Sequence, residues 1–128
     1  MWNVLWVGLG GFIGAGGRYL TGTAVQHWLN PAWLPVGTLT VNIVGCLVIG
    51  ILGRLAQSQQ WLTDQMQLLL ITGILGGFTT FSSFGSETLN LLRQRQVGWA
   101  VAYVGLSLGL GLLAVWLGYT LAGSRGAS

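Results

Sequence analysis

The sequence is poor in charged residues. It has no lysine, and its five arginines, one aspartate and one glutamate make up 5% of its 128 residues. Soluble domains carry roughly 25% charged residues, and a soluble domain of this size could not cover its surface with so few. The scarcity of charge therefore excludes a soluble protein. It also leaves no basic patch to follow a phosphate backbone, so nucleic-acid binding has no support.

Cysteine and histidine are almost absent. Cys46 is the only cysteine, so it cannot form an intrachain disulfide, and its apolar surroundings predict a small buried side chain. His27, the only histidine, is expected in a link between helices as an ordinary polar residue. Metal centres and nucleophile–base pairs need several such side chains together. The sequence therefore predicts neither an enzyme nor a side-chain metal centre.

Long apolar runs fill most of the chain, which is 52% hydrophobic. One membrane-spanning helix takes about 20 residues, so the length allows four and leaves no room for a soluble domain. We predict an all-α membrane protein with a single four-helix transmembrane domain over residues 1–128. We expect the spans at residues 2–22, 36–55, 64–92 and 97–121. Because no basic segment precedes the first apolar run, no cleaved signal peptide is expected.

The arginines give little information about orientation. With four spans, Arg54 and Arg125 lie on the face that carries both termini, and Arg18, Arg93 and Arg95 lie on the other. Asymmetry in Lys and Arg normally fixes orientation, so this balance allows insertion either way up. Two copies in opposite orientations would form an inverted repeat, which many transport proteins build within one chain. A single, weakly biased topology is the alternative.

Glycine is abundant, with 22 residues, and forms pairs spaced four apart within the spans. The pairs are Gly10 with Gly14, Gly73 with Gly77, and Gly105 with Gly109. Such pairs let helix backbones approach closely, either within one subunit or between subunits. Four short helices form a poor channel alone, which favours an oligomer.

The third span contains the stretch GILGGFTTFSSF, residues 73–84. Gly76 and Gly77 lie close to the middle of this span, and each glycine weakens a helix interior by about 1 kcal/mol. We therefore predict that the third helix is broken near its middle, at the glycine pair. Exposed backbone at that depth is tolerated only where protein or an ion covers it. Carbonyl ends suit a small cation, and half-helix N-termini suit an anion.

Polar and aromatic residues follow the predicted break. Thr79, Ser83 and Glu87 repeat every four residues, and Phe81 and Phe84 lie on a neighbouring face. Aromatic ring edges carry partial positive charge, so two rings with nearby hydroxyls form a weak anion site without a fixed cation. Conduction requires such a site, because the ion must also leave it. Core packing is the alternative role for the rings.

Two further motifs place polar side chains in the first and second spans. In GTLTVNIVGCLVIG, residues 37–50, Thr38 and Asn42 are four apart and share a helix face. The amide of Asn42 suits either an anion or an interhelical hydrogen bond. Arg18, near the end of GGFIGAGGRY, suits three roles: reaching the membrane interface, binding helix-end carbonyls, or drawing anions to a vestibule.

These three motifs, in this order and spacing, resemble those of the Fluc (CrcB) fluoride channels, and the resemblance covers essentially the whole chain. It implies a fluoride-selective channel for passive fluoride export across the plasma (inner) membrane of a microbe. It also implies an antiparallel, dual-topology homodimer with a structural sodium ion at its centre and no organic cofactor. The implied partners are fluoride, sodium, the lipid bilayer and a second copy of the chain.

The same resemblance implies roles for individual residues. The fluoride pathway is implied to contain Asn42, Phe81, Phe84, Thr80, Ser82, Ser83, Thr38, Glu87 and Tyr103. The backbone carbonyls of Gly76 and Thr79 match the sodium ligands, and Arg18 matches the arginine of the first motif. The family often has threonine at the position of Ser83, and both residues carry a hydroxyl. Phe78 is assigned to packing.

Two other classes of function compete with this interpretation. A small multidrug antiporter also has four spans and dual topology, but it needs a carboxylate in the first span, and residues 2–22 contain none. A non-conducting structural subunit would use Asn42 and the phenylalanines only for packing. Proton-coupled uptake of a cationic dye would indicate the first class, and absence of fluoride current the second.

Overall fold

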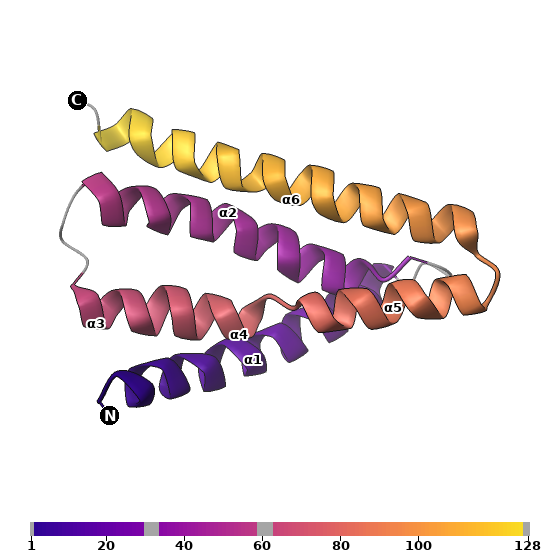
Figure 1. Ribbon diagram of the computed structural model, residues 1–128, viewed down its shortest axis with the longest axis horizontal. Helices are drawn as coiled ribbons and strands as arrows, with labels where there is room; N and C mark the ends of the chain where they lie inside the picture. Colours follow the sequence, from indigo (N-terminus) through magenta and orange to yellow (C-terminus); the bar gives the residue numbers. More distant parts are fainter. Residues whose placement is uncertain (1, 30–33, 59–62, 127–128) are drawn as a thin grey trace.

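The computed structural model describes residues 2–29, 34–58 and 63–126, and within these ranges it contains helices and no strand (Figure 1). The elements are α1 (Trp2–Leu29), α2 (Val36–Ser58), α3 (Asp64–Gln67), the π-helix η1 (Leu68–Leu75), α4 (Gly76–Phe78), α5 (Phe81–Arg93) and α6 (Val97–Gly126). Segments α3, η1 and α4 follow one another without a gap. The prediction of an all-α chain is confirmed.

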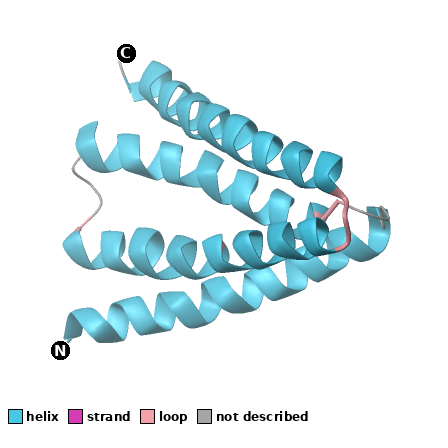
Figure 2. Cartoon of the chain, turned by 45° about the vertical axis from the view of Figure 1, so that its right-hand side comes forward, coloured by secondary structure: helices cyan, strands magenta, loops and turns pink. Residues whose placement is uncertain are grey.

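The helices lie side by side in a bundle, and successive long segments run in opposite directions (Figures 1 and 2). Helix α2 packs along α6, and α1 packs along η1 and α4. The first residues of α1 and the last turns of α6 lie at the same end of the bundle (Figure 1).

Among the described residues, three helical stretches are long and apolar enough to cross a membrane. They are Val36–Gln57, Asp64–Arg93 and Val97–Gly123, and they indicate a multi-pass membrane protein. Helix α1 has sufficient length, with 28 residues, but it is not one of the three, and its seven glycines contribute little hydropathy. The fourth crossing therefore stays a prediction.

The first helix extends beyond its predicted end. The predicted span stops at residue 22, whereas α1 continues to Leu29. No proline occurs between these positions, and the next one in the sequence is Pro31. Because a proline disfavours helical geometry in the residue before it, the helix has no strong stop signal until then. The expectation for His27 was wrong, since it lies in the last turn of α1 and not in a link.

The predicted break at Gly76 and Gly77 was misplaced by two residues. Gly76 has helical dihedral angles (φ −60°, ψ −38°), and α4 extends to Phe78. The extended residues are Thr79 (φ −87°, ψ 156°) and Thr80 (φ −150°, ψ 120°). β-branched threonine tolerates extended geometry better than helical geometry, so the interruption falls on the threonines.

The first two glycine pairs face each other inside the chain. A Cβ added at Gly10 would lie 2.8 Å from the Cα of Gly73, and one at Gly77 would lie 2.7 Å from the carbonyl oxygen of Gly11. Any larger residue would push α1 away from η1 and α4. These glycines therefore serve packing within the subunit, which is the first of the two alternatives considered for them.

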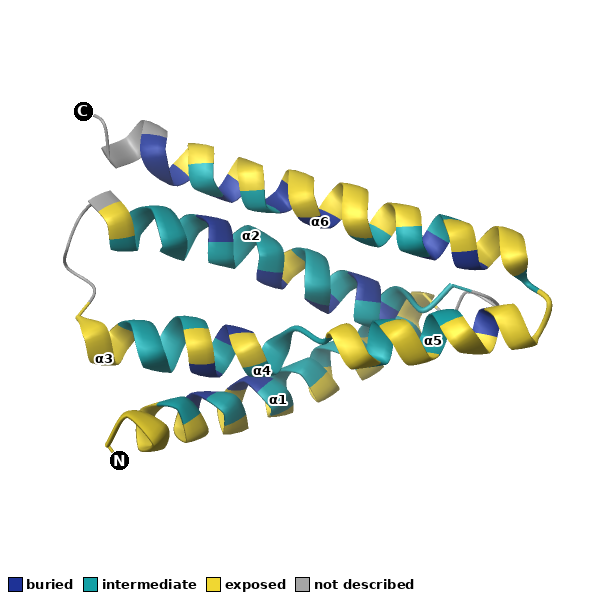
Figure 3. Ribbon diagram, viewed as in Figure 1, coloured by how far each residue is buried: buried dark blue, intermediate teal, exposed yellow. Residues whose placement is uncertain are grey.

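The third glycine pair has no such neighbour. A Cβ added at Gly105 or Gly109 would meet no atom within 4 Å, and both residues lie on the exposed side of α6. Apolar side chains such as Leu112 are exposed on the same helix, and Figure 3 shows exposed residues along the outer faces of α1 and α6. Packing within the chain does not account for this pair.

Candidate functional site

Two cavities meet at the interruption between α4 and α5. The polar cavity, about 710 Å³, is lined by residues of α1, α2 and α5, and by Leu34, Pro35, Thr80 and Gln94. The aromatic cavity, about 400 Å³, is lined mainly by apolar residues of α2, η1, α5 and α6. Thr80 lines both, so the extended residues lie where a polar space adjoins an apolar one.

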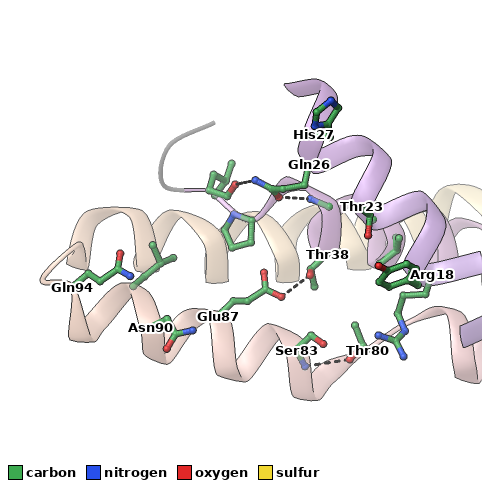
Figure 4. A pocket seen from close by; sticks show the side chains of 17 residues that line it. Arg18, Thr23, Gln26, His27, Thr38, Thr80, Ser83, Glu87, Asn90 and Gln94 are labelled. Atoms are coloured by element: carbon green, nitrogen blue, oxygen red, sulfur yellow. Dashed lines mark hydrogen bonds between the residues drawn. The ribbon is translucent and has the colours of Figure 1, made fainter. Parts of the chain in front are cut away.

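The polar cavity holds one charged side chain of each sign. Arg18 reaches it from α1 and Glu87 from α5, and Figure 4 shows both among hydroxyl and amide side chains. The hydroxyl of Thr38 donates a hydrogen bond of 2.6 Å to the carboxylate of Glu87, which joins α2 to α5. Ser83 lines the same cavity. Four of the predicted pathway residues, Thr38, Thr80, Ser83 and Glu87, are thus brought together with Arg18.

Asn42 binds the extended backbone of Thr80 with its amide. Its Oδ1 accepts from the Thr80 N–H at 2.8 Å, and its Nδ2 donates to the Thr80 carbonyl at 3.0 Å. Both backbone groups would otherwise lack a helical partner at the interruption. Asn42 therefore makes the interhelical hydrogen bonds that were considered as one of its two roles. An amide nitrogen has two N–H groups, so one remains after the bond to Thr80.

Helical pairing of backbone carbonyls stops at the interruption, and for two of these carbonyls the N–H that would pair with them binds a side chain instead. In an α-helix the carbonyl of residue i accepts from the N–H of residue i+4. The Thr80 N–H, which would pair with Gly76, donates to Asn42. The Ser83 N–H, which would pair with Thr79, donates to the Thr80 hydroxyl at 3.2 Å. The two carbonyls are those of Gly76 and Thr79, the residues implied as sodium ligands.

Arg18 binds a third carbonyl beside the interruption. Its Nε donates to the carbonyl oxygen of Gly77 at 3.0 Å, across 59 residues of sequence. A cation at the carbonyl end of a helical segment is favoured by the helix dipole. Arg18 therefore ties a helix-end carbonyl to α1, which is one of the three roles that its sequence position suggested.

Three aromatic rings make successive contacts, and two of them line the aromatic cavity with Asn42. The ring centroids of Phe81 and Phe84 are 5.7 Å apart with planes tilted by 48°, and those of Phe84 and Tyr103 are 5.2 Å apart with a tilt of 52°. Phe81, Phe84 and Asn42 all line the aromatic cavity. Phe84 is half-buried, whereas Phe81 is 83% exposed in the single chain. The structure thus brings the two rings together with the asparagine but leaves one face of Phe81 uncovered.

Two predicted pathway residues line neither cavity. Ser82 is exposed, and its hydroxyl lies 3.4 Å from that of Thr80. Tyr103 is fully buried in the core with Leu39. Tyr103 reaches the aromatic cavity only through its contact with Phe84.

Several residues that line the cavities were not predicted. Cys46, expected to be buried, is half-buried and lines the aromatic cavity together with Ser107. Gln26 lines the polar cavity from α1. The four-residue spacing from Asn42 to Cys46 could have indicated that Cys46 shares the helix face of Asn42 and lines the same cavity. Ser107 is an isolated hydroxyl in an apolar run, and Gln26 belongs to no motif.

Comparison with known proteins identifies one family. The model of the CrcB-like protein family, Camphor Resistance (CrcB), matches residues 5–119. A relative from Methylobacillus flagellatus is 49% identical over 123 residues, which is 94% of each chain. Relatives from Helicobacter pylori (46% identity, 92% of this chain and 91% of theirs) and Acidobacterium capsulatum (43%, 89% and 90%) are similar as well. All three carry the name fluoride-specific ion channel FluC.

Proposed function

The chain belongs to the CrcB family, a family of ion channels and not of enzymes, and we propose that it is a fluoride-selective channel. The observation that carries this proposal is the junction at Thr80, where a polar cavity adjoins one walled by two aromatic rings. An ion pathway needs both a place that attracts the hydrated ion and a place that replaces its water.

The polar cavity is suited to attract the anion. Arg18 carries a fixed positive charge there, and one nitrogen of its guanidinium binds the Gly77 carbonyl, so its other N–H groups are left for an anion. The carboxylate of Glu87 opposes this charge, but the Thr38 hydroxyl holds one of its oxygens. Hydroxyls of Thr80 and Ser83 supply donors without further charge.

The aromatic cavity is suited to select the ion. Fluoride is small and strongly hydrated, so it enters only where donors replace its water. We assign this task to the remaining N–H of Asn42 and to the ring edges of Phe81 and Phe84, which carry partial positive charge. The ring walls exclude larger halides by size. Ser82 and Tyr103 belong to the pathway in this proposal as residues beside Thr80 and Phe84.

We also propose four membrane crossings, the third of them interrupted, and an antiparallel homodimer with dual topology. Three features support this arrangement. The arginines are nearly balanced between the two faces. Within the part of the chain that the structure describes, no atom lies within 4 Å of a Cβ added at Gly105 or Gly109, and most of Phe81 is uncovered. A second copy would cover such surfaces in the bilayer.

The proposal includes a structural sodium ion at the centre of the dimer. The carbonyls of Gly76 and Thr79 fit such an ion, because the N–H groups that would pair with them in a helix bind side chains instead. A backbone carbonyl is an oxygen ligand suited to a hard cation. Two antiparallel copies would supply four such oxygens.

Transport in this proposal is passive, and its direction follows the electrochemical gradient. The membrane potential is worth about 2.3 kcal/mol per elementary charge per 100 mV. A negative interior therefore drives fluoride out of a microbial cytoplasm through the plasma (inner) membrane.

Fluoride efflux from proteoliposomes tests this function. The purified chain is reconstituted in vesicles loaded with potassium fluoride, and efflux is started with a potassium ionophore that carries the balancing charge. Rapid efflux that requires the ionophore is the expected result, because a passive channel moves charge. Efflux without the ionophore, or proton-coupled dye uptake in its place, would contradict the proposal.

A further inference from the structure

One side chain that no sequence motif predicted joins two helices in the lining of the polar cavity. Gln26 lies one turn before the end of α1 and is half-buried. Its Oε1 accepts a hydrogen bond of 3.0 Å from the N–H of Gly37, and its Nε2 donates to the carbonyl of Leu34 at 3.4 Å (Figure 4). The amide orientation is fixed, because only the oxygen can pair with an N–H.

Gln26 completes the start of α2. The first N–H groups of a helix have no acceptor within it. The N–H of Val36 donates to Leu34, and that of Leu39 donates to Pro35. The N–H of Gly37 has its acceptor on another helix, in the Gln26 side chain. The position of the first turn of α2 therefore depends on α1.

The backbones of α1 and α2 meet closely at this point. A Cβ added at Gly37 would lie 3.2 Å from the Cα of Gly22, and Gly22 lies one turn before Gln26 on the same face of α1. This contact fixes the distance between the helices, and the Gln26 amide fixes where α2 begins. The Gly22–Gly37 contact and the Gln26 hydrogen bonds together define the junction of α1 and α2, which is called the corner below.

The corner is part of a ring of side-chain bonds around the polar cavity. On α2, Thr38 binds Glu87 and Asn42 binds Thr80. Arg18 closes the ring by binding Gly77 from α1. It lies eight residues before Gln26, which is about 12 Å along the helix. Without Gln26 the ring is open between α1 and α2.

We infer that Gln26 is a positioning residue for fluoride permeation. It holds the first turn of α2 so that Thr38 and Asn42 meet their partners on α5 and Thr80. This inference rests on the proposed channel function. It assigns Gln26 to the rate of transport and not to ion selection, because the aromatic cavity lies beyond Thr80.

Two substitutions separate the hydrogen bond from the charge and volume of the side chain. Gln26→Leu removes both bonds. Gln26→Glu keeps an acceptor for the Gly37 N–H but loses the donor to the Leu34 carbonyl, and its negative charge at a helix N-terminus is favourable. Gln65→Leu is the matched control, because Gln65 is exposed on α3 and lines neither cavity.

Two quantities are measured on the reconstituted full chain. One is hydrogen exchange of the backbone N–H groups in the first turn of α2, and the other is the efflux of fluoride and of chloride. For Gln26→Leu we expect exchange at Gly37 to rise and fluoride efflux to fall, each about tenfold, the usual scale of one hydrogen bond. The preference for fluoride over chloride is retained. Gln26→Glu should keep hydrogen exchange at Gly37 slow. Its fluoride efflux should be reduced at low salt by the added negative charge and should return toward that of the unchanged chain at high salt, which screens this charge. Gln65→Leu behaves like the unchanged chain.

Gln26→Leu with unchanged exchange and efflux would overturn the inference. Equal loss of efflux in Gln26→Leu and Gln26→Glu at high salt would also overturn it, since the acceptor would then be irrelevant. If Gln26→Leu does not fold, the inference is tested on Gln26→Glu, by hydrogen exchange at Gly37 and by fluoride efflux at high salt. If the unchanged chain passes no fluoride, the channel function fails, and exchange at Gly37 alone tests the contact.

Discussion

The polar and aromatic cavities share Thr80 but differ in almost every other respect. The polar cavity contains Arg18, Glu87 and several hydroxyls, whereas the aromatic cavity has Asn42 as its largest polar side chain and contains no charged residue. Charge attracts a hydrated anion over a distance, and neutral donors and ring edges hold it weakly enough to release. In the channel that we propose, this difference assigns capture to the polar cavity and selection to the aromatic cavity, with Thr80 between them.

The largest effect is expected where the two cavities join. Asn42→Leu leaves the N–H and carbonyl of Thr80 without partners, at a cost of about 1–3 kcal/mol for each. We expect fluoride efflux to be abolished and the apparent Tm of the purified protein to fall. Asn3→Leu, on the exposed start of α1, is the control and should retain both. Normal efflux from Asn42→Leu would show that the boundary at Thr80 has no role.

A large effect is also expected from each ring of the aromatic cavity. Phe81→Ile and Phe84→Ile remove ring edges from the ion, so fluoride efflux should fall about tenfold or more while the assembled protein stays folded. Phe12→Ile is the matched control, because Phe12 is as exposed as Phe81 but lines neither cavity. Unchanged efflux in both ring variants would show that Phe81 and Phe84 serve only in packing.

The two rings should differ in their effect on stability. Phe84 packs against Tyr103 in the core, so Phe84→Ile loses an aromatic contact worth about 0.5–1.5 kcal/mol. Phe81 is mostly exposed in the single chain, so in detergent that separates the two copies Phe81→Ile should lower the apparent Tm less than Phe84→Ile does. Thermal unfolding of both variants in the same detergent measures this difference. A larger loss for Phe81→Ile would mean that its exposed face is covered in the assembly.

A moderate effect is expected from the charge of the polar cavity. Arg18→Gln keeps a donor for the Gly77 carbonyl but removes the charge, so fluoride efflux should fall severalfold at low ionic strength and less at high salt. Arg93→Gln, on the exposed last turn of α5, is the control for net charge. Equal loss at both salt concentrations would assign Arg18 a purely structural role.

The smallest effect is expected from Ser83→Thr. Both side chains carry a hydroxyl, so efflux and selectivity should stay within about threefold of the unchanged chain. A loss comparable to that of the ring variants would place Ser83 in the selection step and weaken the division between the cavities.

Much of this arrangement could be predicted from spacing in the sequence. Residues four apart share a helix face, and this rule places Thr38 with Asn42, and Ser83 with Glu87. Scarcity of charge and long apolar runs predicted a helical membrane protein. The family resemblance is confirmed, and it supplied the residues on both sides of the interruption.

Other features depend on tertiary contacts that spacing does not encode. The interruption fell on Thr79 and Thr80 for two reasons: Gly77 packs in helical form against the backbone of α1, and the β-branched threonines tolerate extended geometry. Gln26 was missed because its role comes from Gly37, on another helix. The second copy and the sodium ion stay predictions because they depend on partners outside the single chain, and the fourth crossing stays one because α1 is not among the three sufficiently apolar stretches.

The central claim is that this chain passes fluoride and rejects larger halides at the aromatic cavity. The most direct test measures fluoride and chloride efflux in parallel from vesicles that contain the unchanged chain. We expect rapid fluoride efflux, with chloride efflux no faster than from protein-free vesicles. Comparable efflux of both anions, or no efflux of either, would contradict it.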